Sequence, residues 1–302
     1  MRLSMSLREF AVLFLVCLIW GLHFIVMKVT VGDTADPLFY AAVRMSIVAV
    51  LMFPWLRWHK GFMWPILGAG LGYGALNYAF MFPALGLTTA SAAAITIELY
   101  VPFSIILSIL VFKDKIGRYK ILGILLAFLG VIVIAAAKPD ETAGPYFLLG
   151  ILLMIGAAMS EAVGAILVKL VKGVGPLQLL AWFAIIGSVV LWPLSFALED
   201  NQLNAFAPEN RKSFAFALAY SALLVSIVAH GSYYWLLQRL PIYIVSSSGL
   251  MTTVIAVIAS AVILGEALTI NLLLGGLITL SGIGLILARN TRNTQNEAKA
   301  PS

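Results

Sequence analysis

The chain has 302 residues, of which 62% are hydrophobic and only 11% are charged, and its formal net charge is +6. A water-soluble domain carries roughly 25% charged residues, so this composition excludes a soluble fold and predicts a lipid-facing surface. The 19 basic residues lie singly between apolar runs, which argues against a nucleic-acid partner and is typical of loops that anchor membrane helices.

Apolar runs interrupted by charged residues, proline and glycine predict an all-α integral membrane protein with ten transmembrane helices. The first run is too long for a signal-peptide core and is interpreted as a retained helix; it contains the single cysteine, Cys17, so no internal disulfide is possible. The predicted spans are residues 9–31, 37–57, 62–83, 88–112, 117–137, 145–170, 175–197, 212–238, 241–264 and 269–289. The connection 198–211 is polar and expected to be mobile, and residues 291–302 are expected to form a disordered cytoplasmic tail.

The basic residues predict the orientation of these helices. With the N-terminus in the cytoplasm, 14 lysines and arginines fall on the cytoplasmic side, three on the outer side and two within spans. Positively charged loops resist translocation, so both termini are expected in the cytoplasm. The protein is expected in the inner membrane of the cell. An odd number of helices would place the tail outside and remove this asymmetry.

The two halves of the chain resemble each other. Residues 112–116 are followed by Gly123 and Gly130, and residues 264–268 are followed by Gly275 and Gly282, at a constant offset of 152 residues. Residues 1–139 and 140–290 are therefore predicted to be two five-helix units. Because five is odd, the second unit is inverted relative to the first, an architecture in which two halves exchange roles as inner and outer gate.

Four segments resemble an EamA-type member of the drug/metabolite transporter superfamily, and YddG-type exporters of aromatic and other amino acids in particular. They are residues 19–24 (Ile-Trp-Gly-Leu-His-Phe), 37–44 (ending Ala-Ala-Val-Arg), 87–93 (Leu-Thr-Thr-Ala-Ser-Ala-Ala) and 264–269 (Leu-Gly-Glu-Ala-Leu-Thr) with Gly275 and Gly282. The resemblance covers residues 10–287. It implies cytoplasmic termini, a central cavity between helices 1–4 and 6–9, and efflux of amino acids or related metabolites. The small multidrug relatives carry a carboxylate in helix 1; this chain has none there, so their proton-coupling scheme does not transfer.

Ionisable residues at membrane depth are the first site candidates, because burying a charge there costs at least ~3 kcal/mol. Glu98 and Glu161 are candidates for coupling or gating; the alternative for each is a structural carboxyl bonded to a hydroxyl or to Arg44. Arg44 either extends to the membrane surface or attracts a substrate carboxylate. Pro102 removes the N–H that would bond the carbonyl of residue 98, which predicts a bend and a possible hinge.

The candidates for binding a neutral or aromatic solute are polar or aromatic residues of the predicted helices. Histidine offers a donor and an acceptor, an amide offers both, and aromatic rings stack on apolar groups. For each of these residues, bridging or packing between helices is the alternative. The substrate-binding candidates are Trp20, His23, Asn77, Tyr78, Glu98, His230 and Tyr234.

These features favour a secondary carrier that exports amino acids by alternating access, with a broad metabolite or cationic-drug exporter as the alternative. An intramembrane enzyme is a remote alternative, since the spans contain no aspartate and none of the usual nucleophile or zinc motifs. No cofactor is predicted, and no metal, because neither a His-x-x-x-His motif nor a cysteine cluster is present. The expected partners are the substrate and the lipid bilayer; a monomer and a homodimer both remain open.

Overall fold

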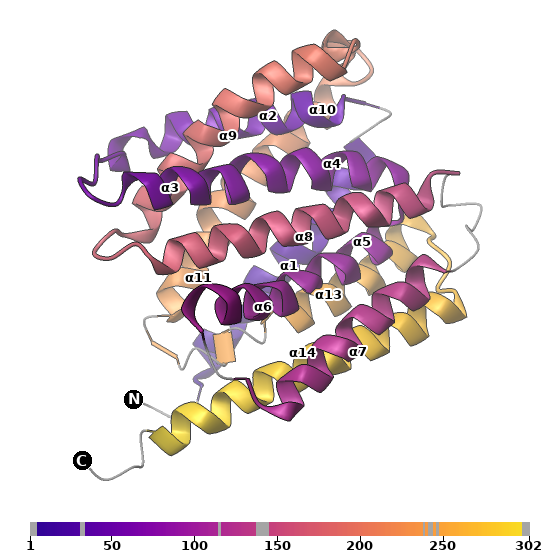
Figure 1. Cartoon of the computed structure of the whole chain (residues 1–302). Coiled ribbons are helices and arrows are strands. Elements are labelled where there is room, and N and C mark those ends of the chain that lie inside the picture. The colour runs from indigo at the N-terminus through magenta and orange to yellow at the C-terminus, as the bar shows by residue number, and fades with distance from the viewer. Residues whose placement is uncertain are drawn as a thin grey trace.

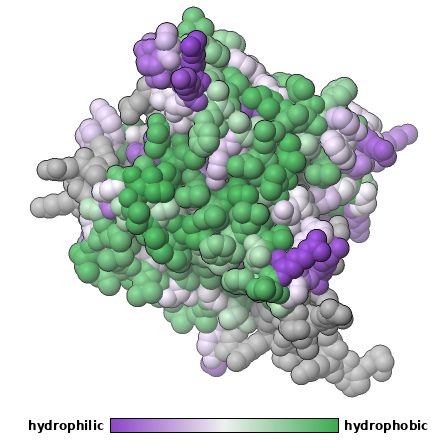
Figure 2. Space-filling view, turned by 180° about the vertical axis from the view of Figure 1, so that it is seen from behind, coloured by the Kyte–Doolittle hydropathy of each residue, from purple (hydrophilic) through white to green (hydrophobic). Residues whose placement is uncertain are grey.

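The fold is known from a computed structural model that describes residues 5–30, 34–113, 116–136, 145–237, 239–240, 244–245 and 248–297. Within these ranges the secondary structure is helical, with no β-strand. Eight helices are long and apolar enough to cross a membrane. Figure 2 shows a broad apolar surface with hydrophilic groups toward its rim, which confirms the all-α membrane fold predicted from composition.

The first half of the chain contains the predicted spans 1–5. Four of them are among the eight membrane-length helices: α1, α2 with η1, α5–η3–α6, and α7. The elements are α1 (Leu7–Thr30), α2 (Pro37–Met52), η1 (Phe53–Trp55), α3 (Met63–Gly70), η2 (Leu71–Leu76), α4 (Asn77–Leu87), α5 (Ala90–Thr96), η3 (Ile97–Leu99), α6 (Tyr100–Phe112) and α7 (Arg118–Ala135).

The second half contains the other four membrane-length helices: α8, α9, the run from α10 into α11, and α14. Its described elements are α8 (Phe147–Lys169), α9 (Pro176–Leu198), η4 (Gln202–Phe206), α10 (Arg211–Ala219), η5 (Tyr220–Ala229), α11 (His230–Leu237), α13 (Ser248–Ala259), η6 (Ser260–Leu264) and α14 (Ile270–Glu297).

The predicted third and ninth spans correspond to residues 63–87 and to the shorter apolar helix Ser248–Leu264. The run 63–87 is helical throughout, but its four glycines between residues 68 and 74 and its polar Asn77 make it less apolar than its neighbours. Such a composition suits a helix that lies among other helices rather than in lipid, because small residues let helices approach closely.

Two segments differ from the sequence-based expectation. The connection 198–211 contains η4, and the Phe206 ring packs edge-to-face against Phe39 and Phe214, with ring centroids 6.0 and 5.6 Å apart, so aromatic packing holds the segment that was expected to be mobile. Helix α14 continues to Glu297, where a disordered tail was expected from residue 291. Residues 270–297 contain no proline, so no proline breaks this helix earlier.

The halves pack against each other through matching helices. Helix α7 pairs with α14, α2 with α9, α8 with α3 and α4, and α1 with α13 and η5. Figure 1 shows α7 and α14 side by side at one edge of the bundle. Helices α7 and α14 are therefore peripheral, as the family resemblance implies for the predicted spans 5 and 10.

The contact between α7 and α14 depends on glycine. A Cβ on Gly123 would lie 2.6 Å from the carbonyl oxygen of Gly282, and a Cβ on Gly275 would lie 2.5 Å from that of Gly130. Since residues 123 and 275, and 130 and 282, are the pairs related by the 152-residue offset, the two contacts exchange when the halves are exchanged. The Thr279 hydroxyl donates to the carbonyl of Ala127 at 3.4 Å; these two residues are themselves 152 positions apart, so this contact joins equivalent positions of the two halves.

The membrane helices are wound irregularly beside the polar residues. η2 precedes Asn77 and η5 precedes His230, and both are π-helical. The wider turns of a π-helix leave carbonyl oxygens free to accept hydrogen bonds from side chains. Such segments are frequent at functional sites. In η5 the Ser226 hydroxyl donates to the carbonyl of Ser221 at 3.0 Å, and His230 Nδ1 lies 2.7 Å from that of Val225.

Candidate functional site

Arg44 lies inside the bundle, on the buried face of α2. Its side chain is only 1% exposed, so the expectation that it reaches the membrane surface is wrong. The guanidinium stacks over Tyr78, 4.7 Å from the ring centroid, with Phe82 5.9 Å away, and its Nη2 donates to the Ser226 hydroxyl at 3.4 Å. Tertiary packing overrides the surface preference because α2 presents Arg44 to α4 and η5, not to lipid.

The charge of Arg44 is incompletely satisfied. Its Nε and Nη1 atoms have no hydrogen-bond partner among the described residues. An unpaired buried donor costs about 1–3 kcal/mol, and more when it is charged. Ring faces compensate part of the charge, because a cation is attracted to the negative face of an aromatic ring.

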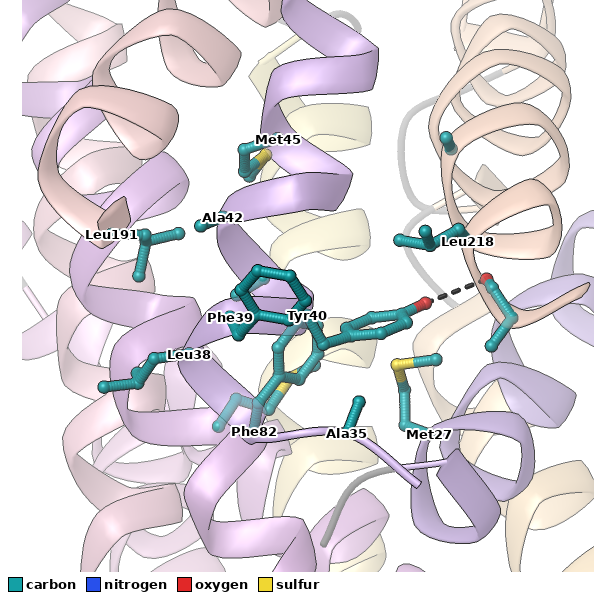
Figure 3. Close-up of a cluster of buried hydrophobic side chains, with 14 of the residues drawn as sticks. Met27, Ala35, Leu38, Phe39, Tyr40, Ala42, Met45, Phe82, Leu191 and Leu218 are labelled. Atoms are coloured by element: carbon teal, nitrogen blue, oxygen red, sulfur yellow. Dashed lines mark hydrogen bonds between the residues drawn. The ribbon is translucent and has the colours of Figure 1, made fainter. Parts of the chain in front are cut away.

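Tyr40 and His23 continue the polar interior beside Arg44. Tyr40 is fully buried; its hydroxyl donates to the carbonyl of Ala217 at 2.8 Å and also bonds the Ser221 hydroxyl. His23 Nε2 bonds the same serine oxygen at 3.2 Å, so Ser221 joins α1 and α2. Figure 3 shows the Tyr40 ring between Phe82 and Leu218, with its hydroxyl hydrogen bond as a dashed line.

Trp20, His230 and Tyr233 form an aromatic group on α1 and α11. The rings of His230 and Tyr233 each lie 5.3 Å from that of Trp20, measured between centroids. Because Nδ1 of His230 faces a carbonyl, it must carry the proton, which leaves Nε2 as the acceptor of the neutral ring. Tyr234 lies in α11, but its side chain is outside the described residues.

Glu98 and Glu161 occupy the other side of the interior. Glu98 accepts a hydrogen bond from the Thr253 hydroxyl at 2.9 Å and lies against Gly249, where a Cβ would be 3.2 Å from its Oε1. A structural carboxyl at Glu98 was expected to bond either a hydroxyl or Arg44. Among the described residues its partner is the hydroxyl of Thr253. Glu161 accepts from the Asn77 amide at 3.3 Å, and Asn77 also donates to the carbonyl of Ala157 at 3.1 Å.

The two carboxyl groups belong to one electrostatic site. Glu98 and Glu161 interact with each other and with Tyr100. Asn77, on the acidic side, and Tyr78, on the Arg44 side, are consecutive residues of α4. Successive residues of an α-helix point about 100° apart. Helix α4 therefore contacts Glu161 through Asn77 and Arg44 through Tyr78.

The helix irregularity predicted at Pro102 is present. The run from Ala90 to Phe112 narrows into the 3₁₀ segment η3, which includes Glu98, immediately before Tyr100 and Pro102. The missing N–H of proline explains why the regular α-helical bonding is interrupted here. Its role as a hinge stays a prediction.

Two carboxylates close the end of the bundle at which α1 ends and α14 begins. Glu266 accepts from the backbone N–H groups of Ala90 and Ser91 at 2.6 and 3.0 Å and from the Ser91 hydroxyl at 2.6 Å. Glu199 accepts from the N–H groups of Leu38 and Phe39 at 2.6 and 2.8 Å. Each acid comes from the second half and caps a helix of the first, where the positive end of the helix dipole favours an anion.

Lys28 completes this closed end. Its ammonium donates to the carbonyls of Leu85 and Thr88 at 2.9 and 2.7 Å, at the C-terminal end of α4. A cation is favoured there for the same reason that an anion is favoured at an N-terminus. Lys28 thus acts as a helix cap rather than as a lipid anchor.

Sequence reasoning did not find Tyr40, Ser221, Ser226 or Glu266. Tyr40 precedes Arg44 by one helical turn, so its shared face was visible in the sequence. The two serines lie within a long apolar run, which is a weak signal. Glu266 is in a loop and resembles a solvated charge, yet it is 6% exposed because it is folded onto the start of α5. Trp182 lies outside this interior: its indole nitrogen donates to the carbonyl of Arg57 at 2.9 Å, at an exposed position.

No group of three or more metal-ligating side chains occurs among the described residues. The site is thus one of hydroxyls, carboxyls, imidazoles and a guanidinium between aromatic rings. The sequence model of the EamA-like transporter family matches residues 8–136 and again residues 148–288. The chain belongs to the EamA-like transporter family. This EamA-like protein is accordingly a multi-pass membrane transporter and not an enzyme, and the two matches fall in its two halves.

Proteins named as transporters or efflux pumps are similar to this EamA-like protein along most of their length. A protein of Salmonella typhimurium named "Probable amino-acid metabolite efflux pump" is 28% identical over 92% of this chain and 94% of its own. A protein of Escherichia coli with the same name is 27% identical over the same shares. A solved crystal structure covers 94% of this chain and 98% of its own at a TM-score of 0.63 and 16% identity, which shows a shared fold.

Proposed function

We propose that this EamA-like transporter exports amino acids, aromatic and other neutral ones, together with related metabolites, across the inner membrane by alternating access. The observation that carries the proposal is the interior where the halves meet: Tyr78 of α4 lies against Arg44, the neighbouring Asn77 bonds Glu161, and the charges of Glu161 and Glu98 interact. A zwitterion with an apolar side chain is complementary to such a site, because it offers one charge of each sign and a group that stacks. The names of the relatives from Salmonella and Escherichia coli support the same substrate class.

Alternating access in this proposal relies on ten helices in two inverted five-helix units, residues 1–139 and 140–290. The exchange of glycine contacts between α7 and α14 supports a two-fold relation between the units. The lysine and arginine distribution supports cytoplasmic termini, which assigns the end closed by Glu266 and Glu199 to the outside. Opening to the outside then requires both caps to separate from the first half.

A broad metabolite or cationic-drug exporter is the second candidate. An incompletely paired Arg44 disfavours it, because a cationic solute entering this interior would meet a like charge at low dielectric constant. The carboxyl groups alone would have favoured it. The two candidates therefore differ in whether a solute needs an anionic group.

The test is uptake of labelled phenylalanine and leucine into proteoliposomes, with vesicles containing Arg44→Gln protein and protein-free vesicles alongside. We expect saturable uptake and counterflow exchange by the wild type, lower affinity in the variant, and inhibition by other neutral amino acids. Transport of a quaternary-ammonium drug in preference to every amino acid tested would refute the proposal in favour of the second candidate.

A further inference from the structure

Arg44 has more hydrogen-bonding capacity than the protein uses. A guanidinium carries five N–H donors arranged as two two-pronged edges that share Nη2. Ser226 takes one donor of Nη2, while Nε and Nη1 have no partner among the described residues. Whichever Nη2 hydrogen Ser226 takes, one edge stays complete, with two parallel donors.

Nothing else in the proposed mechanism explains this free edge. A purely structural arginine at this depth would be paired with Glu98 or Glu161, which are bonded instead to Thr253 and Asn77. The Cζ atom of Arg44 lies 4.7 Å from the centroid of the Tyr78 ring. This contact with the ring face takes up none of the N–H groups in the guanidinium plane. The arrangement orients the cation and leaves its edge for a planar anion.

We propose that Arg44 is the residue that recognises the carboxylate of the transported solute, through two parallel N–H···O bonds from this edge, and that a free carboxylate is therefore required for binding. The inference rests on the proposed function and narrows it. Guanidinium and carboxylate match in geometry as well as in charge. Because Arg44 is 1% exposed, the edge becomes available only as the halves separate, so carboxylate binding belongs to the open states of the cycle.

Ser226 and Tyr78 are positioning residues in this assignment. Ser226 belongs to η5 of the second half, whereas Arg44 and Tyr78 belong to the first. The solute carboxylate would accordingly bind to the Arg44 guanidinium, whose orientation depends on residues of both halves. That dependence links occupancy of the site to the relative position of the halves.

The experiment compares ligands that differ in one functional group. Phenylalanine, 3-phenylpropionate, phenylalaninamide and phenethylamine are measured as competitors of labelled phenylalanine in proteoliposomes, and by the shift in Tm of the detergent-purified protein. We expect phenylalanine and 3-phenylpropionate to bind, and phenylalaninamide and phenethylamine to bind at least about tenfold more weakly. A loss of this size is expected when a charge-assisted hydrogen-bonded pair is removed. Arg44→Gln should abolish this discrimination, Arg44→Lys should keep part of it, and Arg57→Gln, the same change as Arg44→Gln at an exposed arginine, should leave it intact.

The outcomes separate the two proposals. Wild-type protein that binds the amide as well as the acid, or Arg44→Gln protein that discriminates as well as the wild type, overturns the assignment of Arg44 while export of amino acids stands. Carboxylate-specific stabilisation through Arg44 without amino-acid transport overturns the proposed function and leaves the assignment standing. The ligand comparison on wild-type protein decides the matter even if Arg44→Gln fails to fold.

Discussion

Substituting Glu266 by glutamine should open the end of the transporter that we propose to face outward. The carboxylate of Glu266 accepts three hydrogen bonds from the first turn of α5, at 2.6, 3.0 and 2.6 Å. Glutamine keeps the shape but loses the negative charge at the helix N-terminus, and its NH₂ group faces an N–H donor. Loss of the charge costs up to ~2 kcal/mol, and an unsatisfied buried donor costs about 1–3 kcal/mol.

We expect the outward-closed state to be destabilised by about 2 kcal/mol relative to the outward-open state, because the Glu266 contact joins the two halves only when that end is closed. The equilibrium would then shift by roughly 30-fold toward the outward-open state. The assay is the labelling rate of a cysteine introduced at Thr30, which is 2% exposed at the outer end of α1, with a membrane-impermeant maleimide. The background is Cys17→Ala, since Cys17 is the chain's single cysteine.

Glu209→Gln is the matched control, an exposed carboxylate in the connection that precedes α10. It should leave the labelling rate unchanged. A fall in Tm of Glu266→Gln without faster labelling would refute the reasoning, because it would show a helix cap that is lost equally from all states. Unchanged Tm and unchanged labelling would show that the contact contributes nothing to closure.

Two further predictions concern coupling and the contact between the halves. Glu98→Gln should abolish any stimulation of transport by a pH gradient while counterflow exchange continues, because an amide cannot carry a proton through the cycle; stimulation equal to wild type would remove Glu98 from coupling. Gly130→Leu should lower the free energy of unfolding by about 1–3 kcal/mol, seen as a lower Tm, because even its Cβ would overlap the backbone of Gly275 on α14. Gly86→Leu, where nothing lies within 4 Å of an added Cβ, is the control, and an equal loss in both variants would show that the effect is not one of helix contact.

The sequence predicted the site best where a polar side chain lies within an apolar run, because burying such a group in the membrane costs free energy. His23, Asn77, Glu98, Glu161 and His230 stand out because a polar group within an apolar run needs a reason to be there. The structure gives each of these residues a polar or aromatic partner in the interior. The signal fails for ordinary residues: Ser221 links His23 and Tyr40, yet a serine in a membrane helix is unremarkable in sequence.

Partner choice was beyond the sequence for a physical reason. Arg44 was assigned either to the membrane surface or to a carboxylate, and its actual neighbours are the Tyr78 ring and Ser226. An arginine side chain is long enough to reach either environment, so only the direction in which α2 turns its face decides between them. Glu266 is similar, because its burial depends on where the loop before α14 is folded and not on its own sequence.

The sequence by itself determined that this protein is an all-helical membrane protein, because apolar content is a property of the chain and not of its packing, and the resemblance of its motifs pointed to the EamA type. Tertiary structure decided which polar groups meet: Glu161 with Asn77 of α4, the incompletely paired guanidinium of Arg44 with Tyr78 of the same helix, and carboxylates that cap helices of the opposite half. Those pairings join residues separated by more than 150 positions in several cases, such as Glu98 with Thr253 and Glu266 with Ala90. Only the folded arrangement of the helices brings them within hydrogen-bonding distance.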